Sequence, residues 1–180
     1  MSRIQLRFNG ISEVVDNKNM SVIVLTDEAK LRSLSFVCDD MMKQQIALRL
    51  SNRIVTQKFI PEVLIHLVND IADNHSFEIV IHDIVEGEYK VTLMDTNSFG
   101  SYPIRLSDAV LLSLICDMPL YIDAQLMLKQ SEPYKLNSIR MSIPINSIET
   151  EQLKKELEKA IKEENYRLAS YINEELKNRD

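Results

Sequence analysis

The chain has 180 residues, 45% of them hydrophobic, and a formal net charge of −6. This length and composition fit one domain with a real hydrophobic core and a shorter appendage. The negative charge excludes a wholly basic surface of the kind that binds nucleic acids indiscriminately.

Targeting signals and the spacing of cysteines limit the class of protein further. The first residues, MSRIQLRF, contain no apolar signal core, and no run approaches the roughly 18 apolar residues of a membrane-spanning helix. We therefore expect a cytoplasmic protein that does not cross a membrane. Cys38 and Cys116 are far apart and lack metal-binding spacing, which predicts two buried thiols and no disulfide.

The chain begins with residues typical of β-strands. Partly alternating, β-rich runs predict strands over residues 4–15, 21–26 and 34–38. Turn-prone residues at 16–19 separate the first two strands. This part of the chain is therefore expected to be a meander.

A first amphipathic helix is predicted from residues 39–40 to about Arg53, because apolar residues recur at a spacing of four. Its apolar stripe is Met42, Ile46 and Leu50. Another face carries Gln45, Arg49 and Arg53. This face is either solvated, as is usual for long charged side chains, or a phosphate-contacting surface. Lys and Arg outnumber Asp and Glu only in this first third of the chain, which favours it as a source of phosphate ligands.

A second helix is predicted from Pro61, with Glu62 near its positive end. Its expected buried stripe is Leu64, Val68, Ile71 and Ala72. Two β-rich runs then flank a short Glu-Gly turn, which predicts a hairpin of residues 77–85 and 89–95. His82 lies on the first of these strands. It is either a structural strand residue or an acid–base group.

Residues 102–122, YPIRLSDAVLLSLICDMPLYI, predict a strand, a buried helix and a second strand. Asp117 followed by Pro119 gives a stop signal for the helix. At its start, Ser107 or Asp108 is a candidate cap for the free N–H groups, with Arg105 paired to Asp108. The alternative is that Arg105 and the helix N-terminus bind a phosphate or carboxylate.

The amino-acid composition changes in the last part of the chain. After residue 122 we expect a looser segment that includes residues 129–135, and then a final strand over 139–145. From residue 149 onward half of the residues are charged and neither Gly nor Pro occurs, and two apolar stripes break phase at 163–165. This pattern predicts two short antiparallel helices. We therefore predict an α+β fold, with helices packed on a mixed, mainly antiparallel sheet in residues 1–146 and a helical hairpin in residues 147–180.

Three segments carry a family resemblance: IRLSDAVLLSLICDMPLYI, EIVIHDIVEGEYKVTL and LRSLSFVCDDMMKQQIALRL. They are similar to the RPSDAI-type helix and its following strand, the VvIH hairpin, and the LPIWIG segment and helix of the bifunctional nuclease family. The resemblance covers residues 4–129 and implies cleavage of DNA and RNA by a homodimer.

The resemblance also implies site residues. Asp108 or Glu62 helps to hold a divalent ion such as Mg²⁺ or Mn²⁺, and His82 acts as acid or base. Phosphate binding falls to Arg105 with Ser107, and on the residue pattern to Arg49 and Arg53. The chain departs from the family pattern at Met42 (usually glutamate), at Glu62 and Val63 (usually His-Asp) and at Leu106 (usually proline).

The tail, EQLKKELEKAIKEENYRLASYINEEL, is similar to the UVR motif, a helical hairpin of the excision-repair proteins UvrB and UvrC. That resemblance implies docking on a protein partner, and the alternative is a generic charged hairpin. Two functions therefore stay open: a metal-assisted nuclease acting on DNA or RNA, and a non-catalytic adaptor that binds nucleic acid or protein. A small-molecule enzyme has no motif behind it, because the chain lacks a Gly-rich phosphate loop, HExxH and GxSxG.

Overall fold

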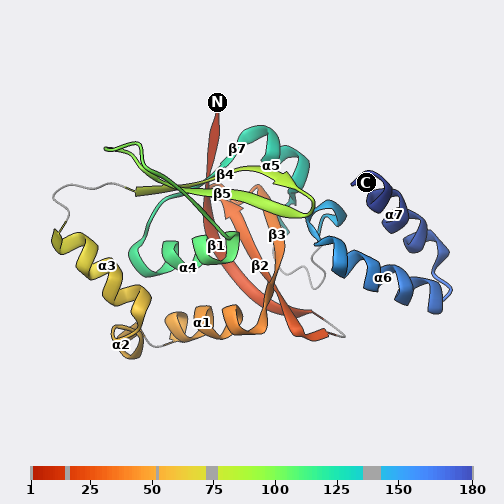
Figure 1. Ribbon diagram of the computed structural model, residues 1–180, viewed down its shortest axis with the longest axis horizontal. Helices are drawn as coiled ribbons and strands as arrows, with labels where there is room; N and C mark the ends of the chain where they lie inside the picture. Colours follow the sequence, from red (N-terminus) through yellow and green to blue (C-terminus); the bar gives the residue numbers. More distant parts are fainter. Residues whose placement is uncertain (1, 15–16, 52, 72–76, 136–142, 180) are drawn as a thin grey trace.

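The computed structural model describes residues 2–14, 17–51, 53–71, 77–135 and 143–179. In these residues the chain forms one eight-stranded sheet with the order β6-β5-β4-β7-β1-β2-β3-β8 (Figure 1). Neighbouring strands are antiparallel except β4 and β7, which are parallel. The strands are β1 (Arg3–Val14), β2 (Asn17–Asp27), β3 (Arg32–Asp39), β4 (Phe77–Val85), β5 (Glu88–Asp95), β6 (Ser101–Ile104), β7 (Leu120–Asp123) and β8 (Glu132–Pro133).

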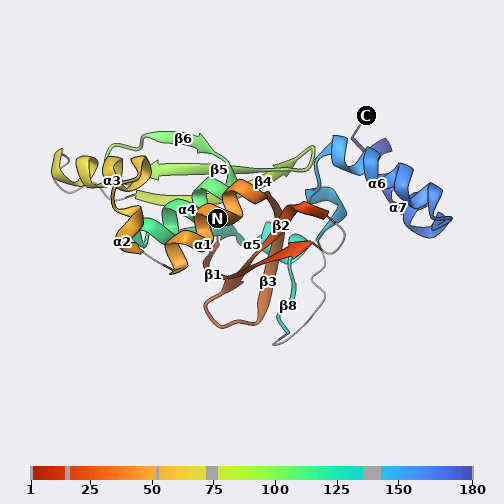
Figure 2. The ribbon, with the colours of Figure 1, turned by 90° about the horizontal axis from the view of Figure 1, so that it is seen from below.

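The helices lie against the sheet and beyond its ends. Helices α1 and α4 contact each other, and both contact strands of the sheet. Helices α6 and α7 lie side by side at the opposite end of the molecule from α3 (Figures 1 and 2). The helices are α1 (Asp40–Ser51), α2 (Arg53–Thr56), α3 (Ile60–Ile71), α4 (Leu106–Cys116), α5 (Ala124–Gln130), the 3₁₀ turn η1 (Ile145–Ser147), α6 (Thr150–Lys162) and α7 (Tyr166–Lys177).

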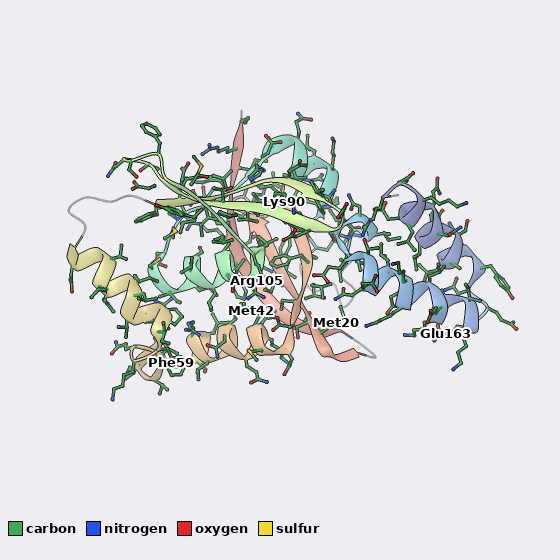
Figure 3. The ribbon with its side chains drawn as sticks, in the orientation of Figure 1. Met20, Met42, Phe59, Lys90, Arg105 and Glu163 are labelled. Atoms are coloured by element: carbon green, nitrogen blue, oxygen red, sulfur yellow. The ribbon has the colours of Figure 1, made fainter. Side chains whose placement is uncertain are left out.

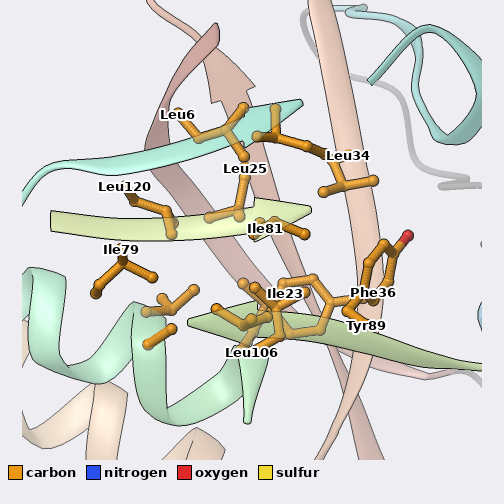
Figure 4. Close-up of a cluster of buried hydrophobic side chains, with 14 of the residues drawn as sticks. Leu6, Ile23, Leu25, Leu34, Phe36, Ile79, Ile81, Tyr89, Leu106 and Leu120 are labelled. Carbon is orange, nitrogen blue, oxygen red and sulfur yellow. The ribbon is translucent and has the colours of Figure 1, made fainter. Parts of the chain in front are cut away.

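The core fills the space between the strands and α4 (Figure 4). Ile23 and Leu25 of β2, Ile79 and Ile81 of β4, and Ile122 of β7 are all fully buried. Their spacing of two places each pair on one face of its strand. Each such side chain stabilises the fold by about 1.5–3 kcal/mol. These strands, some of which also carry polar side chains near their ends, are therefore held firmly in the sheet.

The predicted fold class is confirmed: helices pack on a mixed, mainly antiparallel sheet, and a helical hairpin follows. The opening meander and the hairpin of β4 and β5 lie where the sequence predicted them. Helix α4 ends at Cys116, and Asp117 follows with a left-handed φ of 54°. The predicted stop signal is thus also confirmed.

The segment after β7 is more regular than predicted. Helix α5 occupies residues that were expected to be loose, and the short strand β8 follows it. The missed signal is Asp123, whose side chain accepts hydrogen bonds from the backbone N–H groups of Gln125 and Leu126. The expected strand over 139–145 falls mainly outside the described residues, and Ile145 belongs to η1.

Two predicted apolar stripes are partly wrong. Leu50 at the end of α1 is 55% exposed, and Leu64 and Val68 of α3 are 52% and 42% exposed. Helix α3 instead turns Glu62 toward the interior, where it meets Arg49 of α1. Ion pairing between the helices, which periodicity does not reveal, therefore fixes the rotation of α3.

The tail forms the predicted hairpin, with Leu153 and Ala160 of α6 packed against the α7 side chains Ala169 and Ile172. The Arg179 side chain links this hairpin to the rest of the chain by hydrogen bonds. Its guanidinium donates to backbone oxygens at the β4–β5 turn and around η1, and to side-chain oxygens of α6 and α7. The acceptors are Glu86 O, Ile145 O, Ile148 O, Thr150 Oγ1 and Glu175 Oε1.

The division of the chain into two parts between residues 146 and 147 stays a prediction. None of the helices in the described ranges combines the length and apolar character that a membrane crossing requires.

Candidate functional site

The C-terminal end of β4, the first half of β5, strand β6 and the first turn of α4 line an open hollow of about 690 Å³, which we call the polar hollow. Strand β6 leads directly into α4, so residues that follow it stand beside the side chains of β5. The polar side chains that line the hollow are His82, Glu88, Lys90, Thr92, Ser101, Arg105 and Asp108.

His82 occupies a β-bulge. Ile81 pairs with Val91 and Asp83 pairs with Lys90, so His82 is the extra residue between two regular pairs. A bulge re-aims the side chain of its extra residue, and bulges are common beside active sites. The exposed His82 ring meets Thr92, with 3.1 Å between Nε2 and Oγ1. The backbone therefore places the imidazole over the hollow, and Thr92 fixes its orientation.

Arg105 and Asp108 form a two-armed ion pair at the start of α4. Arg105 donates from Nε to Asp108 Oδ2 over 2.7 Å and from Nη2 to Oδ1 over 3.1 Å. By accepting these hydrogen bonds, Asp108 raises the pKa of Arg105, so the guanidinium stays charged. The predicted pairing of Arg105 with Asp108 is confirmed. The predicted cap is wrong, because within the described ranges no side-chain cap hydrogen bond is formed at the start of α4.

The second charged pair of the hollow joins Lys90 to Glu88 on β5. The Lys90 and Glu88 side chains are 40% and 63% exposed, and those of Arg105 and Asp108 are 67% and 37% exposed. Exposed pairs of this kind contribute only about 0–1 kcal/mol. A phosphate group that enters the hollow therefore meets two cations whose present partners hold them weakly.

Ser107 faces a neighbouring hollow of about 380 Å³, the junction hollow, which lies between the sheet and the start of α6. The two hollows meet at Glu88, Tyr89 and Arg105. Cys38 also lines the junction hollow. Burial raises its pKa to about 11, helped by the charge of Asp39, so the thiol is protonated near neutral pH and is a poor nucleophile. Both cysteines are free thiols; Cys38 is buried as predicted, whereas Cys116 is only half-buried.

Glu62, Arg49 and Arg53 lie elsewhere, around a cavity of about 320 Å³ that we call the inter-helix cavity. Arg49 donates from Nη2 to Glu62 Oε2 over 2.8 Å, and only 3% and 8% of the two side chains are exposed. The ring of Phe59 lies 5.8 Å from the Arg49 guanidinium. Arg49 is therefore a buried cation paired with Glu62, away from the polar hollow, and its phosphate-binding role stays a prediction that this position does not favour.

The two cavities stand at opposite ends of α4. Asp108 belongs to its first turn, whereas the inter-helix cavity is lined by its last residues. Eleven residues at 1.5 Å each make this helix about 16 Å long. In Figure 3, Lys90 and Arg105 lie near the middle of the molecule and Phe59 near the end that carries α3. The structure thus brings His82, Arg105 and Asp108 together, and it does not bring Glu62 to them.

The predicted Mg²⁺ or Mn²⁺ ion stays a prediction, and the carboxylates that would hold it in the polar hollow are paired with cations in this structure. Both oxygens of Asp108 accept from Arg105, and Glu88 is bonded to Lys90. Throughout the described part of the chain, no three His, Cys, Asp or Glu side chains gather as a metal-binding group. Mg²⁺ is held by one or two free carboxylates together with water and phosphate oxygens. A site shared by Asp108 and Glu62 is incompatible with their separation along α4.

Sequence reasoning missed Lys90 and Thr92. They alternate on β5 and therefore share one face of the strand, toward the bulge that carries His82. The available signal was this alternation of polar residues opposite His82 in the predicted hairpin.

Comparison with protein families matches residues 23–135 to a bifunctional nuclease domain. The matched range contains every strand and helix that lines the polar hollow. A comparison with curated proteins gives no match. Because the matched range covers more than half of the 180 residues, this chain belongs to the bifunctional nuclease domain family.

Proposed function

We propose that this protein binds nucleic acid in the polar hollow and cleaves its phosphodiester bonds there. The single observation that carries the proposal is the position of His82, which a β-bulge holds beside two weakly paired cations. An imidazole changes its protonation near neutral pH, and it is the side chain most often used for proton transfer in catalysis. Cations beside it stabilise the charge that develops on phosphorus oxygens.

The ion pair at α4 orients the phosphate-binding group. Arg105 uses Nε and Nη2 for Asp108, which leaves Nη1 for a substrate oxygen. Asp108 is therefore a positioning residue for the guanidinium. Lys90 supplies a second positive charge from β5. No step of the reaction is assigned to the predicted metal.

The proposal is tested by incubating the full chain with single-stranded and duplex DNA and RNA, with and without Mg²⁺ or Mn²⁺. The variants are His82→Gln, Arg105→Ala and Asp108→Ala, and His66→Gln is the matched control because His66 is an exposed histidine outside the polar hollow. We expect loss of His82 to slow cleavage by roughly 100-fold or more, as for a general acid or base. His66→Gln should match the unaltered chain.

Equal trace activity in all of these proteins would indicate a contaminating nuclease, and the proposal would be abandoned. Binding that depends on Arg105, with no cleavage attributable to His82, would leave the adaptor function in its place. The adaptor function is favoured by the two carboxylates of the hollow, Glu88 and Asp108, because both are already paired with cations.

We propose further that a second copy of this chain covers α3, giving the expected homodimer. Five large apolar side chains of α3 are exposed, beside the polar His66 and Asp70, and a groove of about 590 Å³ continues the apolar surface toward β5 and α4. The exposed apolar residues are Ile60, Val63, Leu64, Leu67 and Val68. A helix with such a surface is normally buried against protein, and two copies related by a twofold axis present the same face to each other.

Light scattering on the purified chain tests the dimer. Leu64→Glu should convert dimers to monomers, because it places a charge in the apolar interface. The matched control is Leu31→Glu, since Leu31 is 69% exposed in the turn between β2 and β3, away from α3. A monomeric unaltered chain at micromolar concentration would contradict the proposal.

The tail is proposed to dock on a protein partner, as its UVR-like sequence suggests. The hairpin exposes Tyr166, Tyr171 and Ile161 by 68%, 53% and 53%. A photo-crosslinker introduced at Tyr171 in cells should form one defined adduct that is absent when the crosslinker replaces the exposed Lys155 of α6. Equal labelling from both positions would indicate a generic charged hairpin. A cytoplasmic location stays a prediction.

A further inference from the structure

We infer that the C-terminal hairpin regulates the polar hollow, and that Arg179 is the latch that holds the hairpin in its docked position. The inference rests on the proposed function and adds a control that this function does not require. The hairpin and the segment that leads into it contact the turn that joins β4 to β5. These two strands carry His82 and Lys90 of the polar hollow.

The β4–β5 turn packs tightly against the segment that leads into α6. Glu86 and Gly87 form a two-residue loop, with positive φ angles of 54° and 86°. Gly87 is buried, although the glutamates on both sides of it are exposed. A Cβ atom added to Gly87 would lie 2.3 Å from the backbone oxygen of Ile148. Backbone therefore meets backbone at this contact, and only glycine leaves room for it.

The Arg179 guanidinium lies at the same contact. Its side chain is 8% exposed, and Nη1 donates to Ile148 O over 2.8 Å and to Glu86 O over 3.4 Å. Glu175 accepts from Nε over 2.9 Å and so orients the guanidinium. One side chain of the hairpin thus binds both the β4–β5 turn and the segment that leads into α6.

The hairpin does not share the main hydrophobic core. Within the described ranges, the buried cluster of the sheet ends at Met127 and contains no residue of the hairpin. The apolar side chains that the hairpin buries lie between its own two helices; they are Leu153, Ala160, Ala169 and Ile172. Both helices project beyond the end of the sheet (Figures 1 and 2). An element with its own small core and a polar attachment can separate from the body without global unfolding.

Movement of the β4–β5 turn reaches the polar hollow directly. Glu88 and Tyr89 follow the turn and line both the polar hollow and the junction hollow, and Lys90 comes next on β5. Ser147 and Glu149 of the segment that leads into α6 also line the junction hollow. The docked hairpin therefore supports the first residues of β5. When the hairpin separates, this support is lost and nucleic acid binds more weakly.

The partner proposed for the hairpin operates the latch. Tyr171, the proposed contact for that partner, precedes Glu175 by one turn of α7. A protein bound over Tyr171 therefore meets the carboxylate that orients Arg179. The coupling is reciprocal, so nucleic acid in the hollow strengthens hairpin docking by the factor that docking adds to nucleic-acid binding.

The experiment uses the full chain and three single substitutions. Arg179→Ala removes the latch, and Arg179→Lys keeps the charge but loses the planar fork of donors. Arg167→Ala is the matched control, because Arg167 is an exposed arginine in the first turn of α7, at the other end of that helix from Arg179. Fluorescence anisotropy with a labelled single-stranded DNA and the matching RNA measures binding. Hydrogen exchange followed by mass spectrometry measures opening of residues 84–92 and 145–150.

We expect both Arg179 variants to weaken binding by about fivefold or more and to speed exchange in residues 84–92. Exchange in β2 and the circular dichroism spectrum should stay unchanged, which shows that the sheet remains folded. Arg167→Ala should weaken binding by less than about twofold, because salt screens an exposed charge outside the contact. Saturating nucleic acid should slow exchange in residues 145–150 of the unaltered chain.

The outcomes separate this inference from the function on which it rests. Unchanged binding in both Arg179 variants, or unchanged exchange in residues 84–92, would overturn the inference and leave the proposed function standing. Equal losses in Arg179→Ala and Arg167→Ala, with none in Arg179→Lys, would also overturn it, because charge alone then explains binding. An unaltered chain that binds neither nucleic acid would overturn the proposed function and the inference together.

Discussion

Two arginine–carboxylate pairs stand at opposite ends of α4, and they differ chiefly in their contact with solvent. Arg105 and Asp108 at its first turn are 67% and 37% exposed, whereas Arg49 and Glu62 beside its last turn are 3% and 8% exposed. The hydrogen bonds within the pairs are similar in length, at 2.7 and 3.1 Å in the first and 2.8 Å in the second. The chemistry is the same, and solvent exposure separates their roles.

Exposure decides whether a pair can exchange its partner. Around Arg105 water screens the charges, so the pair is weak and a phosphate oxygen can join it at little cost. Around Arg49 the charges are desolvated, and loss of one partner leaves the other charge buried without a countercharge. The first pair is therefore available for binding, and the second fixes α3 against α1.

The buried pair is also incompletely satisfied. Arg49 Nε and Glu62 Oε1 are buried without a hydrogen-bond partner. Such atoms keep part of their desolvation cost, so the pair contributes less net stability than its short distance suggests. Its main effect is on the position of α3, and thereby on the exposed apolar surface proposed for dimerisation.

The largest effect is expected for Arg49→Ala. This substitution leaves Glu62 charged and buried, and we expect the free energy of unfolding to fall by about 3–5 kcal/mol. Urea denaturation followed by circular dichroism measures the change. Arg53→Ala is the matched control, because Arg53 is exposed beside the same cavity and should cost less than about 1 kcal/mol.

The double substitution Arg49→Met with Glu62→Leu sharpens this prediction. Replacing both charges by apolar groups removes the desolvation cost together with the pair, so most of the stability lost in Arg49→Ala should return. A double variant that is as unstable as the single one would show that the ion pair itself, and not burial of the site, stabilises α3.

A smaller effect is expected at the exposed pair. Arg105→Ala should weaken binding of a single-stranded RNA by about tenfold and lower the salt dependence of binding by about one phosphate contact. Fluorescence anisotropy at several salt concentrations measures both. Arg7→Ala is the control, since Arg7 is likewise exposed and paired with a carboxylate, Glu28, but lies outside the hollow. Equal losses in the two variants would mean that general charge, and not this site, governs binding.

Much of the fold follows from local patterns in the sequence. Alternation of apolar residues placed β4 and β5, and the stop signal at Asp117 placed the end of α4, because these features depend on neighbouring residues. Helix α5 was missed because its signal is a single cap, Asp123. The rotation of α3 was missed because a buried pair with Arg49, thirteen residues away, outweighs the apolar stripe.

The site was predictable only in part. Arg105, Asp108 and His82 were found because the family resemblance and the residue types marked them, and the first two are adjacent on one helix turn. Glu62 was wrongly grouped with them because sequence alone does not show which end of α4 a distant helix approaches. The bulge at His82 needs the pairing register of two strands, which composition does not specify.

The smallest expected effect completes the comparison of the two pairs. Asp108→Asn and Glu62→Gln make the same chemical change, from carboxylate to amide, at opposite ends of α4. Because Asp108 and Arg105 are solvated, Asp108→Asn should change the free energy of unfolding by less than about 1 kcal/mol. Glu62→Gln leaves Arg49 buried without a countercharge and should cost several times more, as expected for an uncompensated buried charge. Both are measured by urea denaturation at one pH near neutral. If the two variants lose equal stability, exposure does not distinguish the pairs, and Arg105 must be regarded as a structural residue like Arg49.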